Sequence, residues 1–298
     1  MRLKELNPSY KVVVLMVILA VFMVLIAAIT AGLLKALWGI DMMEDPFILS
    51  KSGETNYINA ARIATVIQQI GFWAIPALLF IYLTKGDIKN NLPLKKNTLL
   101  QIGLLVVMAL SMQAPVNFFK EINASMASNP DTIQSWSEQN IRNAGIVNTM
   151  MGAWSGMDFL IMIFILAVLP AVCEELLFRG ALQSVFAEAF RNRHLAIWIS
   201  AAIFSYMHME MSGFIPRFLL GALLGYVMWW TGSIWSNILL HFLNNALAVL
   251  LLFGTHHGWL DAGWNSFGSS IETAIPLVLS FLILAGSMFL IGKKGFSN

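Results

Sequence analysis

Residues 218–260 read FLLGALLGYVMWWTGSIWSNILLHFLNNALAVLLLFGTHHGWL and contain no Asp, Glu, Lys or Arg. One membrane-spanning helix needs about 20 consecutive, mostly apolar residues. The 43 residues of this stretch are therefore enough for two spans. The turn signal Thr231-Gly232-Ser233 divides the stretch near its middle.

Other uncharged runs lie on both sides of this stretch. The first lies between Lys11 and Lys35, and its 23 residues make it too long for a signal-peptide core, so we interpret it as a retained helix. The remaining runs lie between Arg62 and Lys85, between Lys96 and Lys120, after Asp158, from Leu195 to Met209, and before Lys293. Together these runs predict an all-α, polytopic integral-membrane bundle of about eight transmembrane helices.

The composition supports the same class. Only 11% of the 298 residues are charged and 58% are hydrophobic, whereas a soluble domain carries roughly 25% charged residues. A soluble enzyme, a nucleic-acid-binding protein and a disordered chain are therefore excluded. The formal net charge of +2 is too small to indicate an electrostatic partner, so the expected partners are the lipid bilayer and a substrate near it.

The placement of Lys and Arg predicts the orientation, because cytoplasmic loops carry more of them. An N-terminus inside places eleven of these residues on the inner side: Arg2, Lys4, Lys11, Lys85, Lys89, Lys95, Lys96, Arg191, Arg193, Lys293 and Lys294. The outer side then holds six: Lys35, Lys51, Arg62, Lys120, Arg142 and Arg217. We therefore expect both termini in the cytoplasm.

Three charges interrupt an apolar run, in the segment Pro170-Ala-Val-Cys-Glu174-Glu175-Leu-Leu-Phe-Arg179-Gly180. A charge at mid-bilayer costs about 2.5–3.5 kcal/mol on insertion scales, so it is retained where it is paired, faces a wet cavity or takes part in chemistry. Glu175 and Arg179 are four residues apart and can pair on one helix face. Glu174 is rotated by about 100° and can face a cavity as a base. The alternative is a clamp in which both acids serve Arg179 and only fix helix packing.

Two further apolar runs carry histidines. Phe204 and His208 are four residues apart in one run, and His241 and Asn245 are four apart in another. Taken singly, each pattern is compatible with a hydrogen-bonded histidine at a helix end or a polar clasp between helices. Taken together with Glu174, they indicate hydrolysis, since carboxylate and imidazole can deprotonate water and imidazole and carboxamide can stabilise an oxyanion. His and Glu also ligate zinc, but no H-E-x-x-H arrangement is present.

The three patterns occur in order within 72 residues as Glu174-Glu175-x-x-x-Arg179, Phe204-x-x-x-His208 and His241-x-x-x-Asn245. They resemble the three motifs of the CPBP family, also called Abi. This family includes the type II CAAX prenyl endopeptidases and bacterial proteins linked to bacteriocin processing and self-immunity. The resemblance covers roughly residues 158–253.

The resemblance implies a membrane-embedded endopeptidase whose substrate is CAAX-type or resembles a bacteriocin precursor. By position, Glu174 with His208 would activate water, and His241 with Asn245 would stabilise the oxyanion. Glu175, Arg179 and Phe204 would support them. The family leaves the cofactor open: a divalent metal such as zinc, held by Glu174, His208 and His241, or none.

The apolar runs and the resemblance together predict how the chain is divided and where the protein is located. Residues 151–253 are expected to form the catalytic core. Residues 1–150 would supply three helices and an outer loop, and residues 254–298 an outer loop and the last helix. An integral, multi-pass protein of a bacterial plasma membrane is expected.

Two other functional classes stay open on the residues alone. Intramembrane acids and histidines also form proton relays, so a proton-coupled transporter is one alternative. A non-catalytic immunity or scaffold protein with the same fold is the other. The nature of the substrate is not readable from the sequence.

Overall fold

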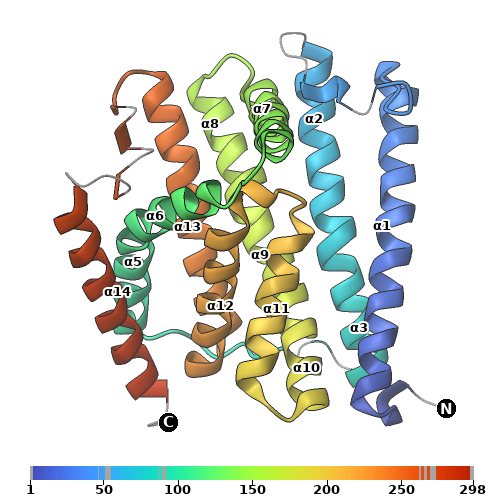
Figure 1. Cartoon of the computed structure of the whole chain (residues 1–298). Coiled ribbons are helices and arrows are strands. Elements are labelled where there is room, and N and C mark those ends of the chain that lie inside the picture. Colours follow the sequence, from blue (N-terminus) through green and yellow to red (C-terminus); the bar gives the residue numbers. More distant parts are fainter. Residues whose placement is uncertain are drawn as a thin grey trace.

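The computed structural model describes residues 3–45, 47–50, 55–86, 88, 92–261, 263–264, 267–268 and 273–295. Arg2, Lys51 and Lys89, which enter the charge count above, lie outside these residues. Long helices run side by side through the molecule, and both ends of the chain lie at the same end of the bundle (Figure 1). Among the described residues the one β contact is an isolated bridge between Leu94 and Ser233. The predicted all-α bundle is confirmed.

The helices of the described residues follow one another along the chain, and most of them are separated by only a few residues. The α-helices are α1 (Pro8–Trp38), α2 (Thr55–Gln68), α3 (Ile75–Lys85), α5 (Leu99–Ser111), α6 (Gln113–Ser125), α7 (Pro130–Met151), α8 (Gly156–Ile163), α9 (Leu169–Glu175), α10 (Gln183–Phe190), α11 (Arg193–Met207), α12 (Phe214–Thr231), α13 (Ile234–His256) and α14 (Ala274–Gly295). Three π-helical turns are η3 (Gln69–Ala74), η4 (Phe164–Val168) and η5 (Leu176–Leu182). Three short 3₁₀ segments are η1 (Leu3–Glu5), η2 (Ile48–Ser50) and η6 (Met211–Gly213).

Seven helical segments of the described chain are long and apolar enough to cross a membrane, so this is an integral, multi-pass membrane protein. The eighth predicted span corresponds to α11, which has only 15 residues. At 1.5 Å per residue it rises about 22 Å, less than the roughly 30 Å of a bilayer core. His208, which follows α11 directly, is therefore placed by a helix that ends early.

Two of the π-helical turns are explained by proline. η3 precedes Pro76 and η4 precedes Pro170, each proline lying at the start of the following α-helix. Proline lacks an N–H and its ring displaces the carbonyl four residues earlier, so the preceding turn widens. As a result α8, η4, α9, η5 and α10 form one irregular helix of 35 residues, 156–190.

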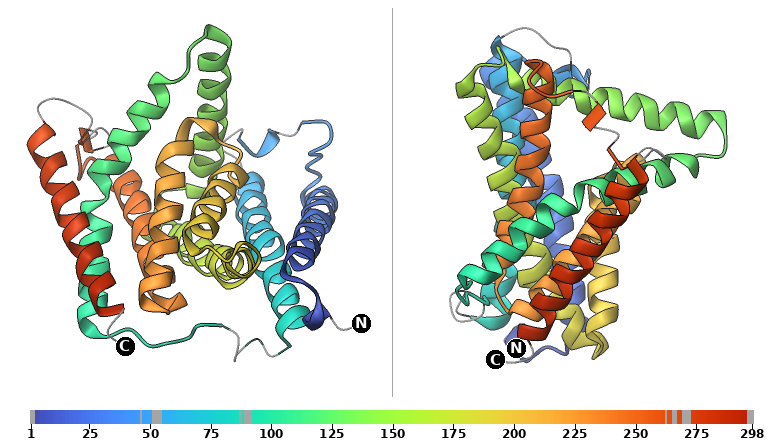
Figure 2. Two further views of the ribbon diagram at one scale, coloured as in Figure 1. Left: turned by 60° about the horizontal axis from the view of Figure 1, so that its bottom comes forward. Right: turned by 90° about the vertical axis from the view of Figure 1, so that its left-hand side faces the viewer.

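Helix α7 differs from all the others in direction and polarity. It projects sideways from one end of the bundle (Figure 2, right). This part of the chain is expected from the sequence to lie in an outer loop, and in the structure Pro130–Met151 forms a helix. Asn129 caps the helix by accepting from the backbone N–H of Thr132 at 2.7 Å, and Pro130 occupies the first turn. These two local signals start a helix although the segment is polar.

The irregular helix lies inside the bundle, where aromatic side chains pack around it. Phe178 is fully buried, and its ring lies 5.0 Å from that of Phe204 on α11 and 5.8 Å from that of Trp73 on η3. The same cluster includes Leu15 of α1 and Phe80 of α3. The N-terminal helices therefore pack directly on the helix that carries Glu174.

We expect Phe178→Ala to lower the free energy of unfolding by roughly 2–3 kcal/mol. The cost comes from the cavity that the ring leaves. The transfer of an apolar side chain between the protein interior and lipid changes the free energy little. Phe164→Ala on the same irregular helix is the matched control, because that ring is 52% exposed. Unfolding in detergent measures both variants, and equal effects would contradict the packing described.

Candidate active site

The two adjacent acids lie on α9, between two π-helical turns. Glu174 is 3% exposed and Glu175 is fully buried. Because η4 precedes and η5 follows them, the helix is widened on both sides of this pair. Such π-turns are frequent at functional sites. Neighbouring positions on a helix face different directions, so the two carboxylates meet different partners.

His208 forms the C-cap of α11 and turns its ring toward Glu174. Its Nδ1 atom lies 2.7 Å from the carbonyl oxygen of Phe204. A carbonyl only accepts, so Nδ1 carries the proton and Nε2 of the neutral ring is an acceptor. This Nε2 lies 3.7 Å from Glu174 Oε2. Two acceptors at that distance leave room for a donor, such as water, between them.

His241 of α13 meets both acids at once. Its Nδ1 lies 2.9 Å from Glu175 Oε1, and its Nε2 lies 3.9 Å from Glu174 Oε2. Glu175 thus orients the imidazole that faces Glu174. Local sequence spacing could not predict this contact, because the two residues are 66 positions apart.

Arg179 neutralises Glu175 and joins two helices. Its Nη1 lies 2.8 Å from Glu175 Oε1, so the ion pair predicted from their spacing is present. Its Nη2 donates to the carbonyl oxygen of Gly221 on α12 at 2.8 Å. α12 packs closely against α11 here, and a Cβ on Gly221 would lie only 3.1 Å from the Cα of Ala201. The guanidinium also lies 5.3 Å from the centre of the Phe204 ring.

A cavity of about 450 Å³ opens beside these groups. Glu174, Phe204, His208, His241 and Asn245 all line it, so one cavity collects predicted residues from three separate helices. Asn245 Oδ1 accepts from Asn244 at 3.1 Å, which leaves the amide nitrogen of Asn245 to donate. Glu175 and Arg179 do not line this cavity, and they support the residues that do.

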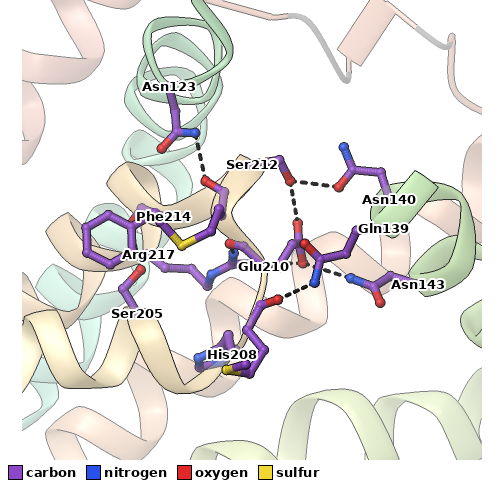
Figure 3. Close-up of polar contacts among 12 residues, drawn as sticks. Asn123, Gln139, Asn140, Asn143, Ser205, His208, Glu210, Ser212, Phe214 and Arg217 are labelled. Atoms are coloured by element: carbon purple, nitrogen blue, oxygen red, sulfur yellow. Dashed lines mark hydrogen bonds and ion pairs between the residues drawn. The ribbon is translucent and has the colours of Figure 1, made fainter. Parts of the chain in front are cut away.

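The cavity also holds polar side chains that sequence reasoning missed. Gln69 of η3, Asn244 of α13 and Arg217 of α12 line it. Arg217 pairs with Glu210, with Nη1 3.1 Å from Oε2 (Figure 3). The sequence contained a signal for it, since Arg217 is the last charge before the 43-residue uncharged stretch. It was instead counted as an outer-side topological charge.

The donor types of Glu174, His208 and His241 suit zinc, which prefers His nitrogen and carboxylate oxygen at about 2.0–2.2 Å. The arrangement fits less well. In the part of the chain that the structure describes, no group of three or more His, Cys, Asp or Glu side chains is disposed to hold a metal ion. The steps of hydrolysis are therefore assigned to the side chains of the protein.

Comparison with known proteins identifies the family of this segment. Residues 156–247 match the family model described as "Type II CAAX prenyl endopeptidase Rce1-like". The match covers about a third of the chain and includes all three motifs. Neither the curated proteins nor the solved structures contain a match. The family that the motifs resemble is confirmed.

We expect Arg179→Leu to destabilise the fold by about 3–5 kcal/mol, because it leaves Glu175 charged and buried without its partner. Arg142→Leu on α7 is the control, since its pair with Glu138 is partly exposed and such pairs contribute about 0–1 kcal/mol. Thermal or denaturant unfolding of both variants in detergent tests the difference. An Arg179→Leu protein as stable as the parent would show that the buried pair is dispensable.

Proposed function

Because residues 156–247 match the model of the Rce1-like type II CAAX prenyl endopeptidases, we propose that this chain hydrolyses a peptide bond at the cavity lined by Glu174. The single observation that carries the proposal is the position of Glu174 Oε2. It lies 3.7 Å from Nε2 of His208 and 3.9 Å from Nε2 of His241, on the wall of one cavity.

The first step is water activation between Glu174 and His208. Both groups offer lone pairs to the space between them, so a water molecule there donates one hydrogen to each. Transfer of a proton to Glu174 produces the nucleophile that attacks the scissile carbonyl carbon. Glu174 is almost fully buried and accepts no hydrogen bond at Oε2 among the described residues. A carboxylate oxygen left without a partner in this way is free to accept a hydrogen bond from water.

The second step is stabilisation of the oxyanion. The amide nitrogen of Asn245 and Nε2 of His241 both face the cavity from α13. The Nδ1–H of His241 is donated to Glu175, so His241 can bind the oxyanion only through a proton on Nε2.

The last step returns the proton. The protonated Glu174 carboxyl donates to the leaving amine, so the peptide C–N bond breaks and the carboxylate is restored. The walls of the cavity away from the acids include apolar side chains such as Leu166, Leu220 and Leu252. A membrane-associated substrate, CAAX-type or bacteriocin-precursor-like, is compatible with such walls. We also propose that the protein lies in a bacterial plasma membrane with both termini in the cytoplasm.

We expect Glu174→Gln and His208→Ala to lower kcat by about 10²–10⁴-fold, because each removes an acceptor for the water proton. Cleavage of a prenylated CAAX peptide and of an unprenylated peptide by purified protein in detergent measures the loss. Gln113→Ala is the control, since this amide donates to the carbonyl oxygen of Ala109 on α5 and does not line the cavity. Cleavage by Glu174→Gln at the parent rate would refute the site.

We expect His241→Ala and Asn245→Asp to lower kcat by about 10²–10³-fold, the cost of losing one oxyanion donor. Asn245→Asp keeps the side-chain size and removes the N–H group, so KM should change little. Asn148→Ala, an amide on α7 outside this cavity, is the control. A change confined to KM would assign Asn245 to substrate binding instead.

A further inference from the structure

The chain turns sharply directly after His208. Met209 has a positive φ of 53°, which is unfavourable for a residue with a side chain. Residues 209–213 then connect α11 to α12, and they lie between the catalytic histidine and the cavity-lining Arg217. The position of His208 therefore depends on how this short connection is held.

Glu210 is the centre of the contacts in this connection (Figure 3). Its Oε2 accepts from Arg217 Nη1 at 3.1 Å and from Asn143 Nδ2 at 3.2 Å. Its Oε1 lies 3.2 Å from the hydroxyl of Ser212, and its backbone carbonyl accepts from Arg217 Nη2. One carboxylate thus joins α12, η6 and α7.

Helix α7 supplies three amides to the same connection (Figure 3). Gln139 donates to the carbonyl oxygen of Met209, and Asn140 accepts from Ser212 at 2.7 Å. Asn143 donates to Glu210. None of these amides belongs to the segment 156–247 that matches the family model. α7 therefore lies outside the matched segment, and it contacts the backbone one residue after His208.

These contacts contribute more to geometry than to stability. The side chains of Glu210 and Arg217 are 27% and 20% exposed, and a partly exposed ion pair adds little to stability. A displacement of about 1 Å of a catalytic group, in contrast, can cost 10²-fold in rate. The strained turn at Met209 also needs surrounding contacts that define it.

We propose that Glu210 is a positioning residue that holds His208 against Glu174, and that α7 takes part through Asn143 and Gln139. This proposal rests on the proposed function. In it, α7 and Arg217 fix the connection from two sides. The His208 ring then stays within reach of the water between it and Glu174.

Three variants test the proposal. Glu210→Gln keeps the acceptor for Asn143 and removes the charge that faces Arg217, whereas Glu210→Ala removes both. Asn143→Ala removes the α7 contact alone. We expect kcat to fall about 10-fold in Glu210→Gln and Asn143→Ala and up to about 100-fold in Glu210→Ala, with KM and melting temperature close to the parent.

The control and the background variant separate the explanations. Gln134→Ala removes an exposed amide of α7 that donates to Glu138, and it should leave kcat unchanged. In the His208→Ala background, Glu210→Gln should cause no further loss, because a positioning residue acts through the group it positions. A further loss there, or parental kcat in Glu210→Ala, overturns the proposal. Parental kcat in His208→Ala would instead refute the proposed function.

Discussion

The arrangement of the site depends on one buried chain of polar contacts, Arg179–Glu175–His241. Glu175 Oε1 accepts from Arg179 on one side and from His241 on the other, at 2.8 and 2.9 Å. Arg179 also bonds the backbone of α12 at Gly221. A charge in an apolar solvent must be paired, so these partners cannot separate without a large cost. Helices α9, α12 and α13 are thereby held in one relative position.

The role of Glu174 follows from the difference between its surroundings and those of Glu175. Glu175 is neutralised within the buried chain, whereas Glu174 faces the cavity and the Nε2 atoms of His208 and His241. Adjacent positions on one helix thus give a structural carboxylate and a free one. The π-helical turns on either side of α9 widen the helix at this point, and Pro170 explains the first of them. Backbone irregularity and charge placement therefore occur at the same place.

Much of the fold could be predicted because the solvent leaves few choices. Long uncharged runs must become helices in a bilayer, and their limits locate most spans directly. The Glu175–Arg179 pair was also predictable, since residues four apart on a helix are neighbours. Three features were missed. α7 was assigned to a loop although Asn129 and Pro130 are local helix-start signals. α11 has only 15 residues, which is short for a full span. Arg217 was counted only as a topological charge, because its place in the cavity wall depends on packing against elements distant in sequence.

The sequence by itself determined the membrane class and the identity of the chemical groups. Charges within apolar runs can be recognised in the sequence whatever the arrangement of the helices. It also placed Glu174, His208, His241 and Asn245 on three separate helices. Only the tertiary structure decided that these helices bring the four side chains to one cavity. It likewise decided that Glu175 orients His241 and that Glu210 ties α7 to the connection after His208. Helical periodicity relates residues within a turn or two, whereas contacts between helices are set by packing, which no local spacing records.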